Sequence, residues 1–224
     1  MVVISLGGSI VCGEELNIEY ISKFRKFLTE FSKKHKIFLV VGGGRVAREY
    51  IHAAENLGMD QYTMDMLGIN ASRMNAALFL GEYSYPRVAM NIEEAVIASS
   101  SYNVVLMGGT EPGHTTDGVS LLLAERLGEN LVVNMTSVGA LYDRDPRVYE
   151  DANKIEHLSY EDAEKMFFEL KMNAGLNIPF DLISLKIAER SRIKICIIGK
   201  DIESLKMVIA DGRCPGTVIG NPHH

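Results

Sequence analysis

Three short glycine-rich turns each follow an apolar run of the sequence. They are Gly7-Gly8-Ser9, Gly42-Gly43-Gly44 and Gly108-Gly109-Thr110. Glycine lets the backbone approach a ligand closely and point several N–H groups at it, and a helix that follows adds the positive end of its dipole. One such turn is weak evidence, because any strand-to-helix connection can use glycine. Three together predict an anion site of the kind that binds phosphate groups.

The segment that follows the third turn is the densest in groups able to contact a phosphate. It reads Pro112-Gly113-His114-Thr115-Thr116-Asp117. Helix capping by one of the threonines explains part of this pattern, and the aspartate suits the dipole of a following helix. Capping does not explain why glycines, a proline and a histidine crowd the same place. We therefore predict a loop that surrounds a phosphate with hydroxyl and amide groups.

Other phosphate-binding patterns can be compared with the sequence directly. It contains no G-x-x-x-x-G-K-[ST] string, and the H-R-D and D-F-G strings of protein kinases are missing as well. The segment 42–47 fits the loose dinucleotide pattern G-x-G-x-x-A, but it follows the second expected strand rather than the first. Asp60 or Asp65 matches the position of the ribose-binding acid only roughly. A nicotinamide-dependent enzyme is thus a weaker alternative.

The elements that must position these turns alternate along the chain. Strands are expected at 2–6, 37–41, 104–107, 131–133 and 193–198, and helices at 18–31, 46–57, 60–80, 119–127, 159–169, 181–190 and 203–209. Apolar strands separated by amphipathic helices indicate a parallel sheet covered on both faces. Gly58 is expected to end the second helix in a left-handed conformation. Residues 142–146 are expected to form a turn, because Pro146 disfavours a helical conformation of the residue before it. The fold class is therefore α/β, with the strand ends that carry the glycines at one edge.

Composition narrows the functional classes. The 224 residues are 47% hydrophobic and 23% charged, which suits one globular domain, and the net charge of −6 provides no basic field for nucleic acid or an anionic membrane. The three cysteines are an odd number without C-x-x-C spacing, so we expect neither a zinc cluster nor a disulfide framework, and a reducing cytosol. The apolar start reads as a first strand rather than a signal peptide or membrane span.

Together these segments carry a family resemblance. The string Gly108–Asp117, with Gly7-Gly8-Ser9 and Val40–Arg48, resembles the archaeal type of UMP kinase in the amino acid kinase family. Residues 180–195 resemble the family's C-terminal lysine helix and last core strand, so the resemblance covers nearly the whole chain. It implies a three-layer αβα sandwich around a mainly parallel sheet, with an acceptor-binding half at about 1–130 and an ATP-binding half at about 131–224.

The implied activity is transfer of the terminal phosphoryl group of ATP to UMP, giving UDP and ADP in pyrimidine nucleotide biosynthesis. The implied cofactor is Mg²⁺, held mainly through ATP rather than by protein side chains, and the implied assembly is a cytoplasmic homohexamer. Expected ATP-binding residues are Ser5, Leu6, Gly7, Gly8, Ser9, Gly44, Arg48, Thr136, Tyr142 and Asp145. Expected UMP-binding residues are Gly43, Asp65, Gly113, His114, Thr115, Thr116 and Asp117. Lys186 and Arg48 are the expected catalytic residues.

The residues themselves suit that chemistry. Phosphoryl transfer needs the two anions held in line while cations and amide groups neutralise charge on the moving group. Lys186 lies between Leu185 and Ile187, so its stem is expected on apolar surface with its ammonium group reaching toward the strand ends. Arg48 has the simpler interpretation of a charge on the polar face of its helix.

The sequence departs from the family pattern in two places. Ser5 stands where many members have a lysine, so Arg48 or Lys186 must supply more of the positive charge. The usual T-x-V-D-G-V-Y segment appears as residues 136–142 with Gly139 and Ala140 in place of its aspartate and glycine. Three further alternatives remain open: a kinase for acetylglutamate or glutamate, an isopentenyl phosphate kinase, and a nucleotide- or anion-binding protein without turnover.

Overall fold

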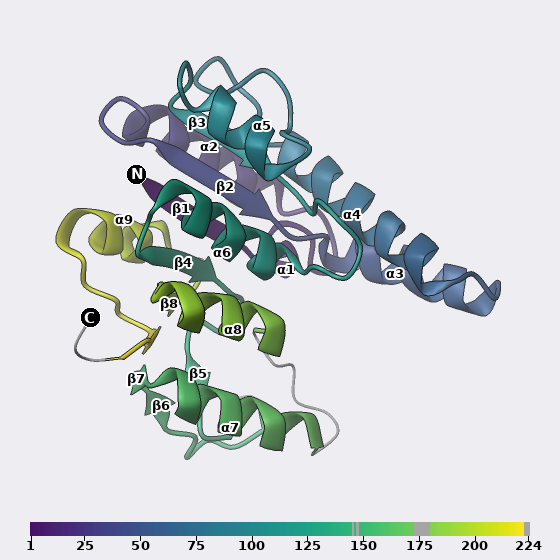
Figure 1. Ribbon diagram of the computed structural model, residues 1–224, viewed down its shortest axis with the longest axis vertical. Coiled ribbons are helices and arrows are strands. Elements are labelled where there is room, and N and C mark those ends of the chain that lie inside the picture. The colour runs from purple at the N-terminus through teal and green to yellow at the C-terminus, as the bar shows by residue number, and fades with distance from the viewer. Residues whose placement is uncertain (145, 147, 173–179, 222–224) are drawn as a thin grey trace.

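A single mainly parallel sheet forms the centre of the protein. The computed structural model describes residues 1–144, 146, 148–172 and 180–221 (Figure 1). Its seven-stranded sheet has the order β3-β2-β1-β4-β8-β9-β7. Neighbours are parallel except β8 and β9. The strands are β1 (Val2–Leu6), β2 (Ile37–Val41), β3 (Val104–Met107), β4 (Leu131–Met135), β7 (His157–Leu158), β8 (Lys194–Ile198) and β9 (Thr217–Ile219), and β5 (Leu141–Tyr142) pairs separately with β6 (Lys154–Ile155).

Helices cover both faces of this sheet, as Figure 1 shows. The packing of buried side chains places α2 and α9 on one face and α5, α6, α7 and α8 on the other. The helices are α1 (Gly8–Val11), α2 (Ile18–Phe31), α3 (Gly44–Asn56), α4 (Gln61–Ala77), α5 (Ile92–Ala98), α6 (Thr116–Leu127), α7 (Tyr160–Met172), α8 (Leu182–Ser191) and α9 (Ile202–Asp211). The expected three-layer α/β sandwich is confirmed.

Strand β1 shows why the central strands are continuously apolar. Side chains alternate between the two faces, so Ile4 and Leu6 pack on the α2 side while Val3 packs on the α6 side. Ser5 shares the face of Val3 and is only 2% exposed. Because β1 is buried on both faces, its sequence lacks the alternation of polar and apolar residues that marks a half-exposed strand. The one polar residue of β1 therefore points at the helix layer that contains α6.

Helices α3 and α4 form an arm that projects beyond the sheet (Figure 1). Gly58, in the turn between them, has φ +71°, which confirms the expected left-handed stop. Apolar side chains on this arm remain exposed, including Tyr50, Leu57, Tyr62 and Met74. By contrast, α2 buries its aromatic face in the core around Phe24. The arm therefore exposes more large apolar side chains than α2, which exposes Ile18.

Sequence patterns located most elements but not all of them. The strands expected at 2–6, 37–41 and 104–107 and the helix at 18–31 have the observed bounds. Helix α5 and strand β9 were not expected, because seven and three residues are too few to display a period. The sheet thereby gains an antiparallel strand, β9, beside β8. No helix in the described part of the chain has the length and apolar character needed to cross a membrane.

The cysteines correct one expectation. Cys196 in β8 and Cys214, just before β9, form a disulfide with a Cα–Cα separation of 5.8 Å, while Cys12 is free and buried. The sequence separation of 18 gave no sign of this pair. The antiparallel return of β9 along β8 brings the two residues together, and no local spacing rule contains that information.

Candidate active site

The helices that follow the first two glycine turns begin differently from the rest. Helix α1 starts after Gly7 and helix α3 after Gly43, and neither has a capping side chain that accepts from its first N–H groups. Every other helix that the structure describes begins with one, from Asn17, Asp60, Asn91, Thr115, Ser159, Asp181 and Asp201. An uncapped helix N-terminus presents N–H groups that an anion can satisfy. The N-termini of α3 and of the shorter α1 can therefore offer N–H groups to an anion at this edge, apart from the Arg45 N–H group, which donates to the Cys12 carbonyl at 2.9 Å.

Glycine in these two turns is required because the turns touch each other. A Cβ atom on Gly8 would lie 2.1 Å from the Gly44 nitrogen, and one on Gly42 would lie 2.7 Å from the Gly8 nitrogen. Gly44 also has φ +61°, a conformation that other residues rarely adopt. The turn expected for ATP and the turn expected between the two substrates thus form one continuous backbone surface.

The third glycine turn has a different origin. Cβ atoms on Gly108 and Gly109 would lie 2.6 Å from Ser72 Oγ and 2.9 Å from Ile69 Cγ1, both on α4. The Gly109 N–H group donates to Ser72 Oγ at 2.7 Å, so it is not free for a ligand. The prediction that all three glycine pairs serve phosphate binding is corrected here, because this pair lets strand β3 pass close to α4.

The loop of residues 109–117 contains the residues expected to bind the UMP acceptor and is called the acceptor loop. It is held against α4 and α8. Asp65 of α4 accepts a hydrogen bond from the Gly113 N–H group at 2.8 Å, so two residues expected at the UMP site are in contact. Gly113 has φ +81°. Thr115 caps α6 by accepting from the Gly118 N–H group at 3.1 Å, and its hydroxyl donates to Asp181 at 2.5 Å. The expected capping role of Thr115 is confirmed, and the same residue links two helix N-termini.

A second pair of expected site residues meets beneath this loop. Ser5 of β1 donates to Asp117 Oδ1 at 2.6 Å. Burial raises the pKa of Asp117 to about 7, the Ser5 hydrogen bond opposes this shift, and the neighbouring Asp181 carboxylate adds to it. A lysine at position 5 would have held this carboxylate ionised. With serine there, Asp117 is a carboxyl group that changes charge near neutral pH.

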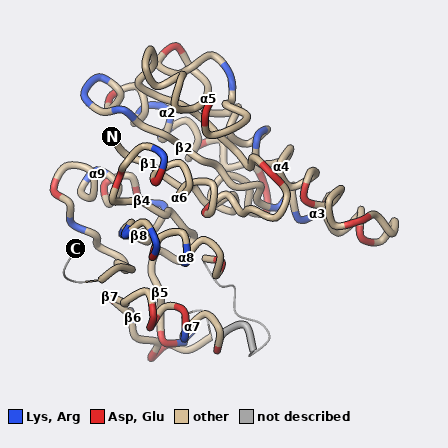
Figure 2. Tube along the Cα trace, viewed as in Figure 1, with Lys and Arg blue, Asp and Glu red and all other residues tan. Residues whose placement is uncertain are grey.

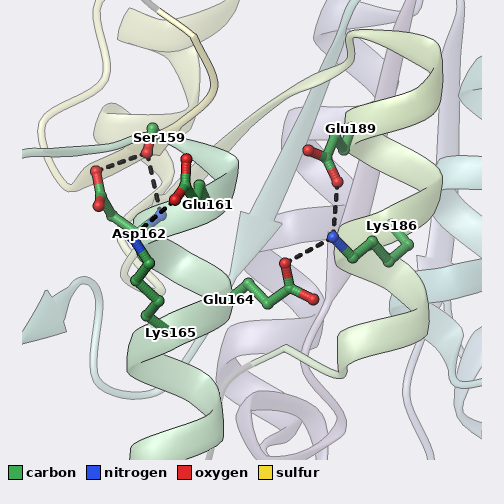
Figure 3. A network of polar contacts seen from close by, with 7 residues as sticks. All are labelled: Ser159, Glu161, Asp162, Glu164, Lys165, Lys186 and Glu189. Carbon is green, nitrogen blue, oxygen red and sulfur yellow. Dashed lines mark hydrogen bonds and ion pairs between the residues drawn. The ribbon is translucent and has the colours of Figure 1, made fainter.

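Lys186 lies elsewhere than the residue pattern suggested. Its ammonium group donates to Glu164 of α7 at 2.6 Å and to Glu189 of α8 at 2.9 Å, as Figure 3 shows. Both hydrogen bonds raise the pKa of Lys186, and the bond to Glu164 has the larger effect. The expectation that its ammonium reaches toward the strand ends is therefore wrong for this structure. Two carboxylates within reach of an exposed lysine attract it to the α7–α8 surface.

Most of the remaining expected residues lie on the surface of the strand-end region. Arg48 on α3, Ser9 on α1 and His114 in the acceptor loop are exposed. In the described part of the chain no ion pair involves Arg48, whereas Arg45 pairs with Glu49. Figure 2 shows other Lys and Arg residues distributed over many elements, with Asp and Glu among them. Arg48 is therefore available to meet a ligand.

Two expected site residues, Leu6 and Thr116, lie against the second glycine turn. The Leu6 side chain has no exposed surface, and its carbonyl accepts from the Gly42 N–H group at 2.9 Å. Leu6 thus joins the two turns and has no side chain to offer ATP. Thr116 begins α6, and its Oγ1 lies 3.5 Å from the position of a Cβ on Gly42. The acceptor loop and the second glycine turn therefore lie side by side.

The expected adenosine side is built around a tight turn after β4. Thr136 Oγ1 accepts from the Gly139 N–H group at 3.0 Å. Gly139 has φ +86°, and a Cβ there would lie 3.2 Å from Gly199 Cα, so the departure from the family aspartate fits a local requirement for glycine. Tyr142 follows on β5, opposite Lys154 of β6. Asp145 lies outside the described residues.

Several residues of this region were not expected from the sequence. Asp181 joins α8 to the acceptor loop, and Ser72, Arg73 and Asn75 of α4 bind backbone groups of the strand ends. Asp181 carried a usable signal, since it precedes a helical pattern with a serine three residues later. Ser72 and Asn75 are buried polar residues of α4, 1% and 4% exposed. Their bonding partners depend on tertiary packing.

Comparison with known proteins places this arrangement in a family. The amino acid kinase family model matches residues 1–81 and 82–199. A uridylate kinase from Thermoplasma volcanium is 41% identical over 210 residues, covering 93% of this chain and 92% of the relative. One from Methanocaldococcus jannaschii is 38% identical and covers 97% of this chain and 98% of the relative.

Solved structures agree with these sequence matches. The crystal structure of uridylate kinase from Archaeoglobus fulgidus superposes with a TM-score of 0.85 at 37% identity, covering 98% of this chain and 100% of that chain. UMP kinase from Bacillus anthracis, at 19% identity, shares the fold with a TM-score of 0.78. With its sheet order, its paired glycine turns and a match over most of its length, this chain belongs to the amino acid kinase family.

Proposed function

We propose that this protein transfers the terminal phosphoryl group of ATP to UMP, giving UDP and ADP. The observation that carries the proposal is the edge where the uncapped α1 and α3 meet the acceptor loop, in a chain whose similar relatives are uridylate kinases. Amide groups of two touching turns suit two phosphate groups that must face each other. Gly7, Gly8 and Ser9 would hold the donor, and Gly43 with residues 113–117 the acceptor.

Charge on the moving group requires cations at the same edge. Arg48 and Gly44 lie on α3 between the two expected substrates, and Arg48 has no ion-pair partner in the described chain. Lys186 can join only by leaving Glu164 and Glu189. We propose that nucleotide binding moves this ammonium group, because the triphosphate of ATP carries more negative charge than either carboxylate.

Mg²⁺ is proposed as the metal that accompanies ATP. This ion commonly binds through phosphate oxygens, waters and one or two carboxylates. Asp117 and Asp181 lie at the strand-end edge, while no group of three or more His, Cys, Asp or Glu in the described ranges could hold a metal. These donors fit an ion held mainly by the triphosphate, which would neutralise charge during transfer.

The remaining proposals concern organisation. The half at about 1–130 is proposed to bind the acceptor and to supply the glycine turns that meet the ATP phosphates, and the half at about 131–224 is proposed to bind the rest of ATP. The assembly is proposed to be a cytoplasmic homohexamer that serves pyrimidine nucleotide synthesis. The exposed apolar residues of α3 and α4 support self-association. Light scattering coupled to size exclusion measures the assembly, and a monomer at micromolar concentration contradicts it.

A coupled ADP-release assay tests the reaction. UMP, CMP, GMP and AMP are offered as acceptors, together with acetylglutamate, glutamate and isopentenyl phosphate. We expect turnover with UMP, with Mg²⁺ required. Turnover with a carboxylate acceptor alone would make the protein another kinase of the family. ATP binding without turnover of any acceptor would identify a nucleotide-binding protein that lacks catalysis.

A further inference from the structure

Helix α4 holds the ends of two strands by their backbones. The Asn75 amide donates to the Gly42 carbonyl at 2.8 Å, and Ser72 Oγ accepts from the Gly109 N–H group at 2.7 Å. Arg73 Nε donates to the Gly109 carbonyl at 2.9 Å. Ser72 and Asn75 are buried, so each bond replaces a lost contact with water. The ends of β2 and β3 are thus fixed to one helix.

Arg73 makes the most extensive of these connections. Besides Gly109, its Nη2 donates to the carbonyls of Thr110 and Met90, each at 3.2 Å. No carboxylate among the described residues lies within ion-pair distance of this guanidinium. A planar group with five donors can bind several carbonyls at once, which lysine cannot reproduce. Arg73 therefore binds backbone only, and its positive charge is not neutralised by a carboxylate there.

The carbonyls that Arg73 binds begin the acceptor loop. Gly109 and Thr110 lead directly to Gly113, whose N–H group donates to Asp65 of the same helix. The loop is thus attached to α4 at two points, by Arg73 at 109–110 and by Asp65 at 113. Among the described residues, no α4 side chain forms a hydrogen bond with the first glycine turn, Gly7-Gly8, which is formed by β1 and α1.

We propose that Arg73 is a positioning residue for the phosphoryl acceptor. It fixes the start of the acceptor loop so that residues 113–117 face the α3 N-terminus, and its charge favours an anionic acceptor nearby. This inference rests on the proposed UMP kinase activity. Replacing Arg73 weakens binding of the acceptor. It leaves ATP binding largely unchanged, because Arg73 does not touch the residues expected to bind ATP.

The test compares Arg73→Ala, Arg73→Gln and Arg73→Lys with the wild type. Arg126→Ala is the matched control, because Arg126 binds a single carboxylate, Glu93, at the surface. We expect Arg73→Ala and Arg73→Gln to raise KM for UMP by about tenfold or more, as for lost charge-assisted hydrogen bonds. KM for ATP should change by less than about twofold, and Arg73→Lys should be intermediate because it can keep one or two bonds.

Hydrogen exchange of the amides of residues 109, 110, 111 and 113 gives a second readout that needs no activity. Exchange should accelerate in Arg73→Ala and Arg73→Lys but not in Arg126→Ala. Unchanged exchange, or an equal rise in both KM values, overturns the proposal. If the wild type turns over no UMP, the proposed function fails, while the exchange measurement still decides whether Arg73 fixes the loop. If Arg73→Ala does not fold, the lysine and glutamine variants carry the same comparison.

Discussion

Ser5 and Asp117 are joined by a 2.6 Å hydrogen bond between the first strand and the start of α6. The bond links the turn expected to hold ATP with the loop expected to hold UMP. It also places a carboxyl group with a pKa of about 7 under the site, since burial opposes its charged form. The state of this group therefore affects both stability and substrate binding near neutral pH.

The folded wild-type protein should lose stability as the pH rises and Asp117 ionises. The Asp117→Asn variant should not show this loss. An aspartate in an unfolded chain has a pKa near ~3.9, so the native state with its raised pKa holds the proton more tightly. The resulting stabilisation is present below about pH 4 and is lost as the pH rises to about 7. We expect the stability of the variant relative to wild type to increase over that range, measured by urea unfolding.

Asp60→Asn provides a control of opposite sign. The hydrogen bond from the Thr63 N–H group lowers the pKa of Asp60, so its contribution is present above the unfolded pKa and is lost in acid. Its variant should lose relative stability as the pH rises. If the stability of both variants relative to wild type changed in the same direction with pH, the raised pKa of Asp117 would be contradicted.

Gly8→Ala should disrupt the joined glycine turns. The new methyl group would lie 2.1 Å from the Gly44 nitrogen and 2.6 Å from the Gly42 carbonyl, so backbone must move. We expect a loss of about 1–3 kcal/mol in the free energy of unfolding, with most activity lost. Thermal or urea unfolding and the ADP-release assay measure the two effects.

Gly58→Ala is its matched control. Gly58 has φ +71° and nothing within 4 Å of an added Cβ, in the α3–α4 turn. The strained conformation should cost about 1–2 kcal/mol in stability without removing activity. Equal loss of activity in both variants would show that stability alone, and not the contact between the turns, explains the Gly8 result.

Lys186→Ala separates catalysis from surface pairing. If Lys186 leaves Glu164 to meet the transferred group, its removal should lower kcat by roughly 10²-fold, as when one charge-stabilising donor is lost. Stability should change little, because the pairs are exposed and screened by water. Steady-state kinetics and unfolding curves measure both.

Lys165→Ala is the control for this variant. Lys165 pairs with Glu161 on α7 at 2.8 Å, in the same exposed setting (Figure 3). We expect no change in kcat. An unchanged kcat in Lys186→Ala as well would assign Lys186 a surface role and leave Arg48 as the expected catalytic cation.

Thiol titration tests the disulfide between Cys196 and Cys214. Unfolded, unreduced protein should show one reactive thiol, from Cys12, and reduction should raise the count to three. Reduction or Cys214→Ala should lower stability by about 3 kcal/mol, the value expected for closing a loop of this size. Three reactive thiols before reduction would contradict the pairing.

The amino-acid sequence by itself determined the α/β class and the central strands, and it predicted a phosphate-binding edge. It could do so because apolar runs and glycine turns are local patterns, and parallel strands place their ends together whatever the details. It also gave the family through residues 108–117. Short elements such as α5 and β9 lacked enough residues to show a pattern.

Only the tertiary structure decided which partner each site residue has. Gly108 and Gly109 were grouped with the other glycines, yet the approach of α4 explains them. Lys186 was expected at the strand ends, yet two carboxylates hold it at the surface. The Cys196–Cys214 bond, the Arg73 contacts and the Ser5–Asp117 pair all join segments distant in sequence. Such contacts depend on how elements pack, and local residue patterns do not encode that packing directly.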